Sequence, residues 1–145
     1  MTVTAKAYGK LREHLWRGLI NIEDDYIRGM LCTNEYVPNQ DTHDFKDDVT
    51  HEVSGDGYII AGMLLENIVL TYDAPTNTLQ IAADDLIWAS STITARYLVL
   101  YDATPATNAT RPLIGYVDFG ADVVSSGGSF TVEWTDGIVL TDPVT

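Results

Sequence analysis

The side chains that could do chemistry are concentrated between residues 41 and 52, in the stretch DTHDFKDDVTHE. His43 and Asp47 are four residues apart, as are Asp47 and His51, so a helix would place all three on one face. Zn²⁺ needs three or four such ligands converging on one point, whereas Ca²⁺ or Mg²⁺ would use only the carboxylates. The stretch matches neither the His-Glu-x-x-His pattern nor an EF-hand loop. We therefore interpret it as a solvated acidic loop with no metal ligand, and a bound cation is the alternative.

The serines offer no better centre for catalysis. None of them lies in a Gly-x-Ser-x-Gly elbow, where a nucleophilic serine would be held on a strand-to-helix turn. The stretches SGDG and SSGGS are rich in glycine, but they do not lead from a strand into a helix, so they are predicted to be tight turns and not phosphate-binding loops. We therefore predict no catalytic residue, no cofactor and no enzymatic activity.

The net charge argues against several classes of partner. The formal net charge is −13 over 145 residues. Nucleic-acid binding needs a basic surface, so no nucleic-acid partner is expected. Residues 1–40 hold five Lys or Arg and five Asp or Glu, whereas residues 41–145 hold 16 acidic residues against Lys46, Arg96 and Arg111. The N-terminal quarter is therefore chemically distinct from the remainder.

Apolar residues make up 46% of the chain, which is ordinary for a globular protein. No apolar run approaches the ~20 residues of a membrane-spanning helix, and the first residues lack the basic and apolar regions of a secretory signal. We expect neither a membrane partner nor secretion. The single cysteine, Cys32, lies in an apolar run, which predicts a buried and unreactive thiol.

The local patterns predict a chain made mostly of strands. Residues 6–20 have the apolar spacing of a short amphipathic helix, and residues 26–33 are typical of a first strand. Residues 34–57 are polar and predict a long ordered loop with a single helical turn. From Tyr58 onward, β-branched and alternating runs predict strands throughout, about eight in all.

This order of elements predicts an all-β fold. We expect a single β-sandwich, jelly-roll or Ig-like, that spans residues 1–145 as one domain. Residues 1–25 would form an N-terminal helical or anchoring segment of that domain.

The segment TITARYLVLYD predicts a central strand buried on both faces, because apolar residues occupy both alternating sets. One face would carry Ile93, Ala95, Tyr97, Val99 and Tyr101. Arg96 interrupts this strand, and Asp102 or Asp118 is expected to pair with it, because a buried cation needs a partner. SFTVEW alternates strictly, which predicts a strand with one face exposed to water.

Three segments together resemble a family of small virion structural proteins of tailed bacteriophages. They are MLCTNEYVPNQDTHDFKDDVTHEVSGDGY, LTYDAPTNTLQIAADDLIWASSTITARYLVLYD and PLIGYVDFGADVVSSGGSFTVEW. The likeness runs from about residue 26 to residue 141 and is sharpest around WASSTITARY and IGYVDFG. The resemblance implies a component of the virion, assembled in the cytoplasm of the host bacterium. It carries over no catalytic residues.

Within that class we expect a capsid decoration (cement) protein, which binds the outside of the assembled head. Its partners would be the major capsid protein or other virion subunits, and it would self-associate, with a trimer as the expected form. The alternative is a tail or fibre component, including a module that binds the host surface. A small virion hydrolase is a third class, which would need a nucleophile–base pair or a metal site.

The expected docking surfaces are residues 1–20 and the loop 34–57. On the predicted helix, Lys6, Lys10 and Arg17 would share one face, with Arg12 and Trp16 at its margins. The opposite face, with Leu11, Leu15 and Leu19, would pack on the sandwich. The alternative is a solvated helix that covers a sheet edge.

Overall fold

The computed structural model describes residues 5–134 and 140–141. Over this part of the chain it contains eight strands and one short α-helix. Strands account for 48% of the residues and helices for 9%, which confirms the predicted all-β class.

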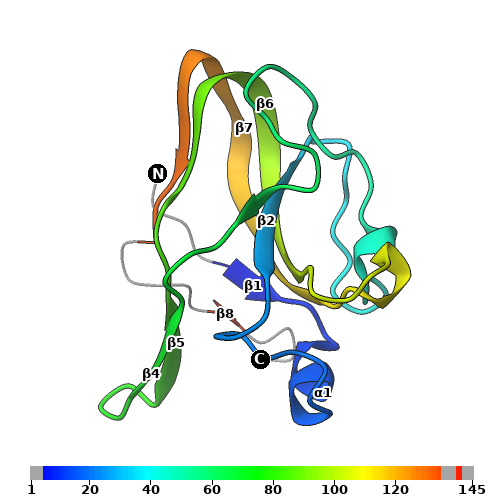
Figure 1. Cartoon of the computed structure of the whole chain (residues 1–145), viewed down its shortest axis with the longest axis vertical. Helices are drawn as coiled ribbons and strands as arrows, with labels where there is room; N and C mark the ends of the chain where they lie inside the picture. Colours follow the sequence, from blue (N-terminus) through cyan, green and yellow to red (C-terminus); the bar gives the residue numbers. More distant parts are fainter. Residues whose placement is uncertain (1–4, 135–139, 142–145) are drawn as a thin grey trace.

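Six of the strands form one sheet, in the order β3-β2-β6-β7-β1-β8 (Figure 1). All neighbours in this sheet are antiparallel except β1 and β8, which run parallel. The strands are β1 (Ala5–Ala7), β2 (Ile27–Cys32), β3 (Met63–Leu64), β6 (Leu86–Asp102), β7 (Leu113–Val132) and β8 (Leu140–Thr141). A separate antiparallel hairpin consists of β4 (Val69–Asp73) and β5 (Thr78–Ala82).

The pair β6–β7 is the longest element of the fold. The sequence pattern predicts LIWAS and TITARYLVLYD as separate strands on one side of this hairpin, and PLIGYVDFG and GSFTVEWT as separate strands on the other. In the structure each side is one continuous strand. Where a break was expected after Ser90, the strand continues through a bulge, and Ser90 has a φ of 50°. Figure 1 shows both strands curving over at the top of the molecule. The pair therefore forms a bent ribbon.

The bend lays the start of β6 across the sheet that contains its end. A Cβ atom on Gly29 of β2 would lie 2.8 Å from Leu86 Cδ1 and 3.1 Å from Leu98 Cδ1. Leu86 begins β6, whereas Leu98 lies near its end, so both parts of the strand pack on the same face of β2. The first apolar core lies inside this fold and includes Trp88, Phe130 and Val132.

A second core lies on the opposite face of the sheet. Its buried members are Tyr8, Met30, Cys32, Tyr36, Val99, Tyr101, Leu113 and Tyr116. Cys32 is fully buried as predicted, and burial raises the pKa of its thiol to about 12, which keeps it protonated and unreactive. The sheet is therefore covered on both faces where β2 and the end of β6 lie.

The prediction that Ile93, Ala95, Tyr97, Val99 and Tyr101 share one face of β6 is wrong. A register shift between Ala95 and Tyr97 changes which face the side chains occupy. Ile93 and Ala95 belong to the first core, but Val99 and Tyr101 belong to the second. At the bulge, Arg96 Nε donates to Asp118 Oδ1 at 2.6 Å, so Asp118 is the partner and not Asp102.

The loop 34–57 is ordered and contains the single helical turn that was predicted, η1 (Lys46–Asp48). The loop is held to the second core by a chain of hydrogen bonds. Tyr8 Oη lies 2.8 Å from Tyr36 Oη, which lies 2.9 Å from His43 Nδ1. Because the backbone N–H of Asn39 also donates to Nδ1, this nitrogen is an acceptor and the Tyr36 hydroxyl donates to it.

After this loop the chain crosses to the first core. Val53 N–H donates to Leu31 O at 2.9 Å, and Thr92 N–H donates to Asp56 O at 2.9 Å. The stretch GYIIAGMLL, residues 57–65, predicts a strand, but only Met63–Leu64 form one. Gly57, Ala61 and Gly62 all have positive φ angles, which interrupt the extended backbone of this stretch.

We predict that Gly62→Ala destabilises the protein by about 2 kcal/mol or more. The added Cβ would overlap the carbonyl oxygen of Gly29 and lie 2.8 Å from Met30 Cα, and backbone atoms cannot move aside as a side chain can. The free energy of unfolding in urea measures the effect.

Two alanine variants serve as controls. Gly120 also has a positive φ but nothing lies within 4 Å of its Cβ position, so Gly120→Ala should cost only about 1–2 kcal/mol of backbone strain. Gly128 has open space and an ordinary φ, so Gly128→Ala should change stability by less than about 0.5 kcal/mol. Equal effects at positions 62 and 120 would contradict the steric account.

Candidate functional site

The helix α1 (Leu11–Trp16) presents apolar side chains to solvent. Leu11 and His14 are buried, but Trp16 is 89% exposed, and Leu15 and Leu19 are exposed at 36% and 50%. The prediction that Leu15 and Leu19 pack on the sheet is therefore wrong. The helix has only six residues and ends before Gly18, whose φ is 76°, so the apolar stripe expected over residues 6–20 never forms.

Basic side chains surround this exposed apolar group. Lys10 Nζ lies 3.5 Å from Glu13 Oε1 and Arg17 Nε lies 3.4 Å from Glu13 Oε2, so both flank one carboxylate on one side of the helix, as predicted. Arg12 is exposed on the helix. We define the α1 surface as Lys10, Arg12, Leu15, Trp16, Arg17 and Leu19. Exposed ion pairs of this kind stabilise a protein by less than about 1 kcal/mol, so the cations can exchange partners at little cost.

Lys6 does not belong to this helical face. It lies in β1, opposite Tyr116, because residues 5–7 form a strand before the helix begins. There its charge acts on Asp118, whose pKa is lowered mainly by the hydrogen bond from Arg96 and to a smaller extent by Lys6.

The buried side of α1 rests on the loop 34–57. The His14 ring lies 5.2 Å from the Phe45 ring, centroid to centroid. His14 Nδ1 and Asp44 Oδ1 are both buried without a hydrogen-bond partner. Burial lowers the pKa of His14, although the nearby Asp44 carboxylate opposes this effect. The helix is thus held in place by its buried side while Trp16 projects outward.

The residues 41–52 do not converge on a point. The i, i+4 spacing of His43, Asp47 and His51 does not place them on one helical face, because only Lys46–Asp48 are helical and His51 has a φ of 61°. Across residues 5–134 and 140–141, no three His, Cys, Asp or Glu side chains are arranged to hold a metal ion. His43 contacts Tyr36 instead, and Asp48 Oδ2 accepts from the backbone N–H groups of Asp44 and Phe45.

The loop 34–57 combines buried and exposed residues. Tyr36 and Val53 are buried in the two cores, whereas Val37 is largely exposed. As a docking surface, this loop is therefore limited to exposed positions such as Val37 and Glu35.

The sequence did not single out a second exposed apolar feature, the β4–β5 hairpin, here called the arm (residues 67–82). Figure 1 shows it projecting from the body at the same end as α1. Val69, Tyr72 and Leu79 are exposed, with Tyr72 at 60%. A signal was present, because residues 67–82 of this acidic chain contain Asp73 as their one charged residue.

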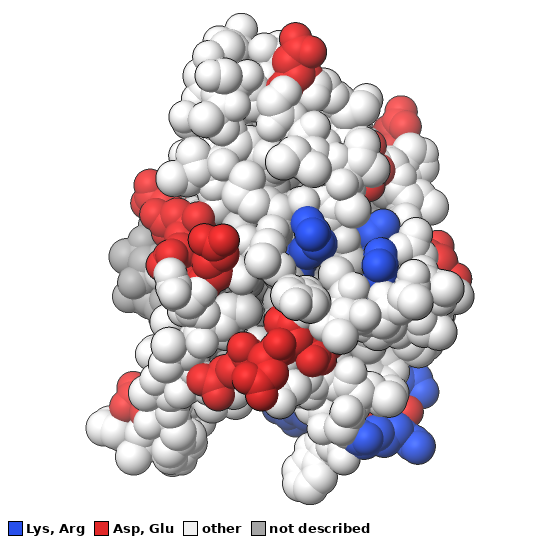
Figure 2. Space-filling model, viewed as in Figure 1, with Lys and Arg blue, Asp and Glu red and all other residues white. Residues whose placement is uncertain are grey.

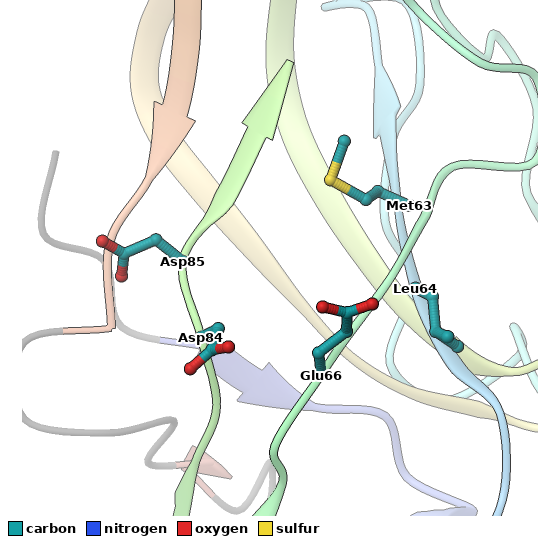
Figure 3. A pocket seen from close by; sticks show the side chains of 5 residues that line it. All are labelled: Met63, Leu64, Glu66, Asp84 and Asp85. Atoms are coloured by element: carbon teal, nitrogen blue, oxygen red, sulfur yellow. The ribbon is translucent and has the colours of Figure 1, made fainter. Parts of the chain in front are cut away.

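A small acidic hollow lies at the base of the arm. It is lined by Met63, Leu64, Glu66, Asp84 and Asp85, whose side chains are drawn in Figure 3. Its volume of about 180 Å³ is below the ~300–1,000 Å³ of typical small-molecule pockets. Glu23 adds a further carboxylate nearby, since its Oε2 accepts from Leu70 N–H at 3.2 Å.

The buried carboxyl group of Asp102 lies beside the half-buried Asp25, in the segment between α1 and β2. Asp102 is fully buried, and its Oδ1 accepts from Thr104 N–H at 3.0 Å. Burial and the hydrogen bond to the Asp25 carboxyl raise the pKa of Asp102 to about 7. Below about pH 7 the Asp102 carboxyl therefore keeps its proton. Nearby, Ala103 N–H donates to Tyr26 O at 2.7 Å.

Comparison with known proteins finds no matching family model, no matching curated protein and no matching solved structure. Among the helices in the described part of the chain, none is long and apolar enough to cross a membrane.

We predict that the protonated Asp102 makes the protein lose stability as the pH rises from about 4 to about 7, against an opposite contribution from His14, whose pKa burial lowers. In this window the folded protein keeps the Asp102 proton that the unfolded chain releases, so the unfolded state binds fewer protons and gains stability with pH. The loss should reach roughly 3–4 kcal/mol and then level off above pH 7. Urea unfolding at a series of pH values measures it.

The variant Asp102→Asn tests the assignment. Asparagine can keep the contact with Thr104 N–H and donate to Asp25, so this variant should lose most of the pH slope and exceed the wild type in stability at pH 8. Asp41→Asn, at an exposed position, should keep the wild-type slope. An unchanged slope in Asp102→Asn would show that another group is responsible.

Proposed function

We propose that the protein is a structural component of a bacteriophage virion, a decoration (cement) protein that binds the outside of the assembled head through the α1 surface. Its partner is the major capsid protein or another virion subunit, and it reaches the virion during assembly in the bacterial cytoplasm. A function of this kind makes and breaks no covalent bond. The likeness of WASSTITARY and IGYVDFG to virion proteins supports the choice of class.

The observation that carries the docking proposal is the exposure of Trp16. A tryptophan that is 89% exposed leaves a large apolar surface in water, and in soluble proteins clustered apolar surface of this kind marks contact sites. Tryptophan and arginine are also the residues most enriched at the energetic centres of protein interfaces. Both occur side by side here, at positions 16 and 17.

The charges around Trp16 favour an acidic partner surface. Lys10, Arg12 and Arg17 form a basic edge on a protein whose net charge is −13. Such a basic surface would meet carboxylates on a neighbouring subunit, which speeds association and sets orientation more than it adds affinity. Exposed residues of the loop 34–57, such as Val37, would contribute a second contact.

A tail or fibre component, including a module that binds the host surface, is the second candidate. The observation in its favour is that the arm and α1 bring Tyr72 and Trp16, both exposed, to the same end of the molecule. Quantitative mass spectrometry of purified virions separates the two candidates. Hundreds of copies per virion would support the head, and a handful would support the tail tip, fibre or neck.

We predict that Trp16→Ala weakens binding to the virion by about 2 kcal/mol, or roughly 30-fold, because it removes the apolar centre of the contact. Lys10→Ala should have a much smaller effect that fades at high salt. Purified protein would be added back to particles that lack it, and occupancy measured across a range of salt concentrations.

The exposed Tyr26 provides a matched control, since Tyr26→Ala removes an exposed aromatic ring that is not part of the α1 surface and should leave occupancy unchanged. A variant in which Lys10, Arg12 and Arg17 are all neutral tests the charges of the α1 surface together. If this triple variant and Trp16→Ala both bind like the wild type, the α1 surface is not the docking site.

A further inference from the structure

The arm exposes apolar side chains that the fold itself does not cover. Val69, Tyr72 and Leu79 are each more than half exposed, although they lie on the strands of a regular hairpin. A two-stranded hairpin is marginally stable in water on its own, so an arm of this kind gains stability when a partner covers it. Its near absence of charge makes it a surface that an acidic protein can approach without repulsion.

The acidic hollow lies directly at the base of the arm. Asn67 Nδ2 donates to Asp84 Oδ2 at 2.6 Å, which holds the Asp84 carboxylate where the arm leaves the body. Asp84 N–H donates to the backbone carbonyl of Glu66 at 3.0 Å, which brings the two residues together. Met63 and Leu64 supply an apolar lining (Figure 3). The space suits one long cationic side chain, because its apolar stem can lie on Met63 and Leu64 while its charged end meets the carboxylates of Glu66 and Asp84.

The α1 surface has the properties that complement this site. It presents Trp16 and Leu19 beside Arg17, that is, an apolar group next to a guanidinium. Figure 2 shows acidic side chains gathered on the face beside the arm, and basic side chains gathered at the lower right, where α1 lies. One molecule therefore carries two different surfaces, one basic and apolar, the other acidic and apolar.

We infer that the arm and the acidic hollow of one copy bind the α1 surface of a second copy. Trp16 packs on the arm near Tyr72, and Arg17 reaches the carboxylates at the base of the arm. Because the two surfaces differ, the contact is head-to-tail, and successive copies close into a ring when the rotation between them allows it. This inference rests on the proposed function, because it concerns the same α1 surface. In a copy whose α1 surface is covered by a neighbour's arm, the exposed residues of the loop 34–57 remain for the capsid contact.

Two complementary variants test the contact in solution, without virus particles. The first carries Trp16→Ser and Arg17→Glu, which removes the α1 surface but leaves the arm intact. The second carries Tyr72→Lys and Glu66→Lys, which removes the arm site but leaves α1 intact. All four positions are exposed, so each variant should keep the wild-type unfolding temperature. Sedimentation velocity is measured up to millimolar concentration.

The wild type should associate increasingly with concentration, and each variant alone should associate at least ~30-fold more weakly. An equimolar mixture of the two variants should form a 1:1 dimer that grows no further, because only one intact pair of surfaces remains. Val124→Lys, at an exposed position on the ribbon, should behave as the wild type.

A wild type that stays monomeric at millimolar concentration, or a mixture that stays monomeric, would overturn the inference. Binding to the capsid is measured separately, by add-back of the second variant (Tyr72→Lys and Glu66→Lys), which keeps the α1 surface intact. Loss of add-back by Trp16→Ala together with no self-association would leave the proposed function standing and remove only this contact.

Discussion

The hydrogen-bond ladder between β6 and β7 is the constraint on which the rest of the structure depends. It runs from Leu86 opposite Val132 to Tyr101 opposite Leu113, far longer than its neighbours in the sheet. A ribbon of this length cannot stay flat and bury its apolar face, so it bends and encloses the first core. β2 and β1 then pair with its two outer edges, and the arm leaves from its beginning.

Much of this fold could be predicted from the sequence, because strands depend on local patterns. The alternation in SFTVEW placed Phe130, Val132 and Trp134 on a buried face, and all three are buried. The bulge at Arg96 could not be predicted in the same way. Alternation assumes one residue per step along the ladder, and a single extra residue exchanges the faces of everything that follows. Positive φ angles outside glycine, such as that of Ala61, also depend on contacts distant in sequence.

The residues of the proposed docking surface could be predicted by their type, but their exposure to solvent could not. Lys10, Arg17 and Trp16 stood out by their chemistry, whereas the exposure of Leu15 and Leu19 depends on where the helix ends. The exposure of the arm could not be predicted either. Its strands have the apolar content of core strands, and nothing local distinguishes a hairpin that projects into solvent from one that packs on a sheet.

The position of β1 has a consequence for the order in which the molecule is completed. Lys6 lies between Tyr116 on one side and Thr141 on the other, so its strand finds both neighbours only after they have left the ribosome. Pairings so distant in sequence form late and slowly. Since α1 follows β1 directly, nascent and truncated chains cannot yet hold Trp16 in its final place. A chain therefore completes both pairings of β1 only once it has been synthesised as far as β8, which delays any assembly built on that helix.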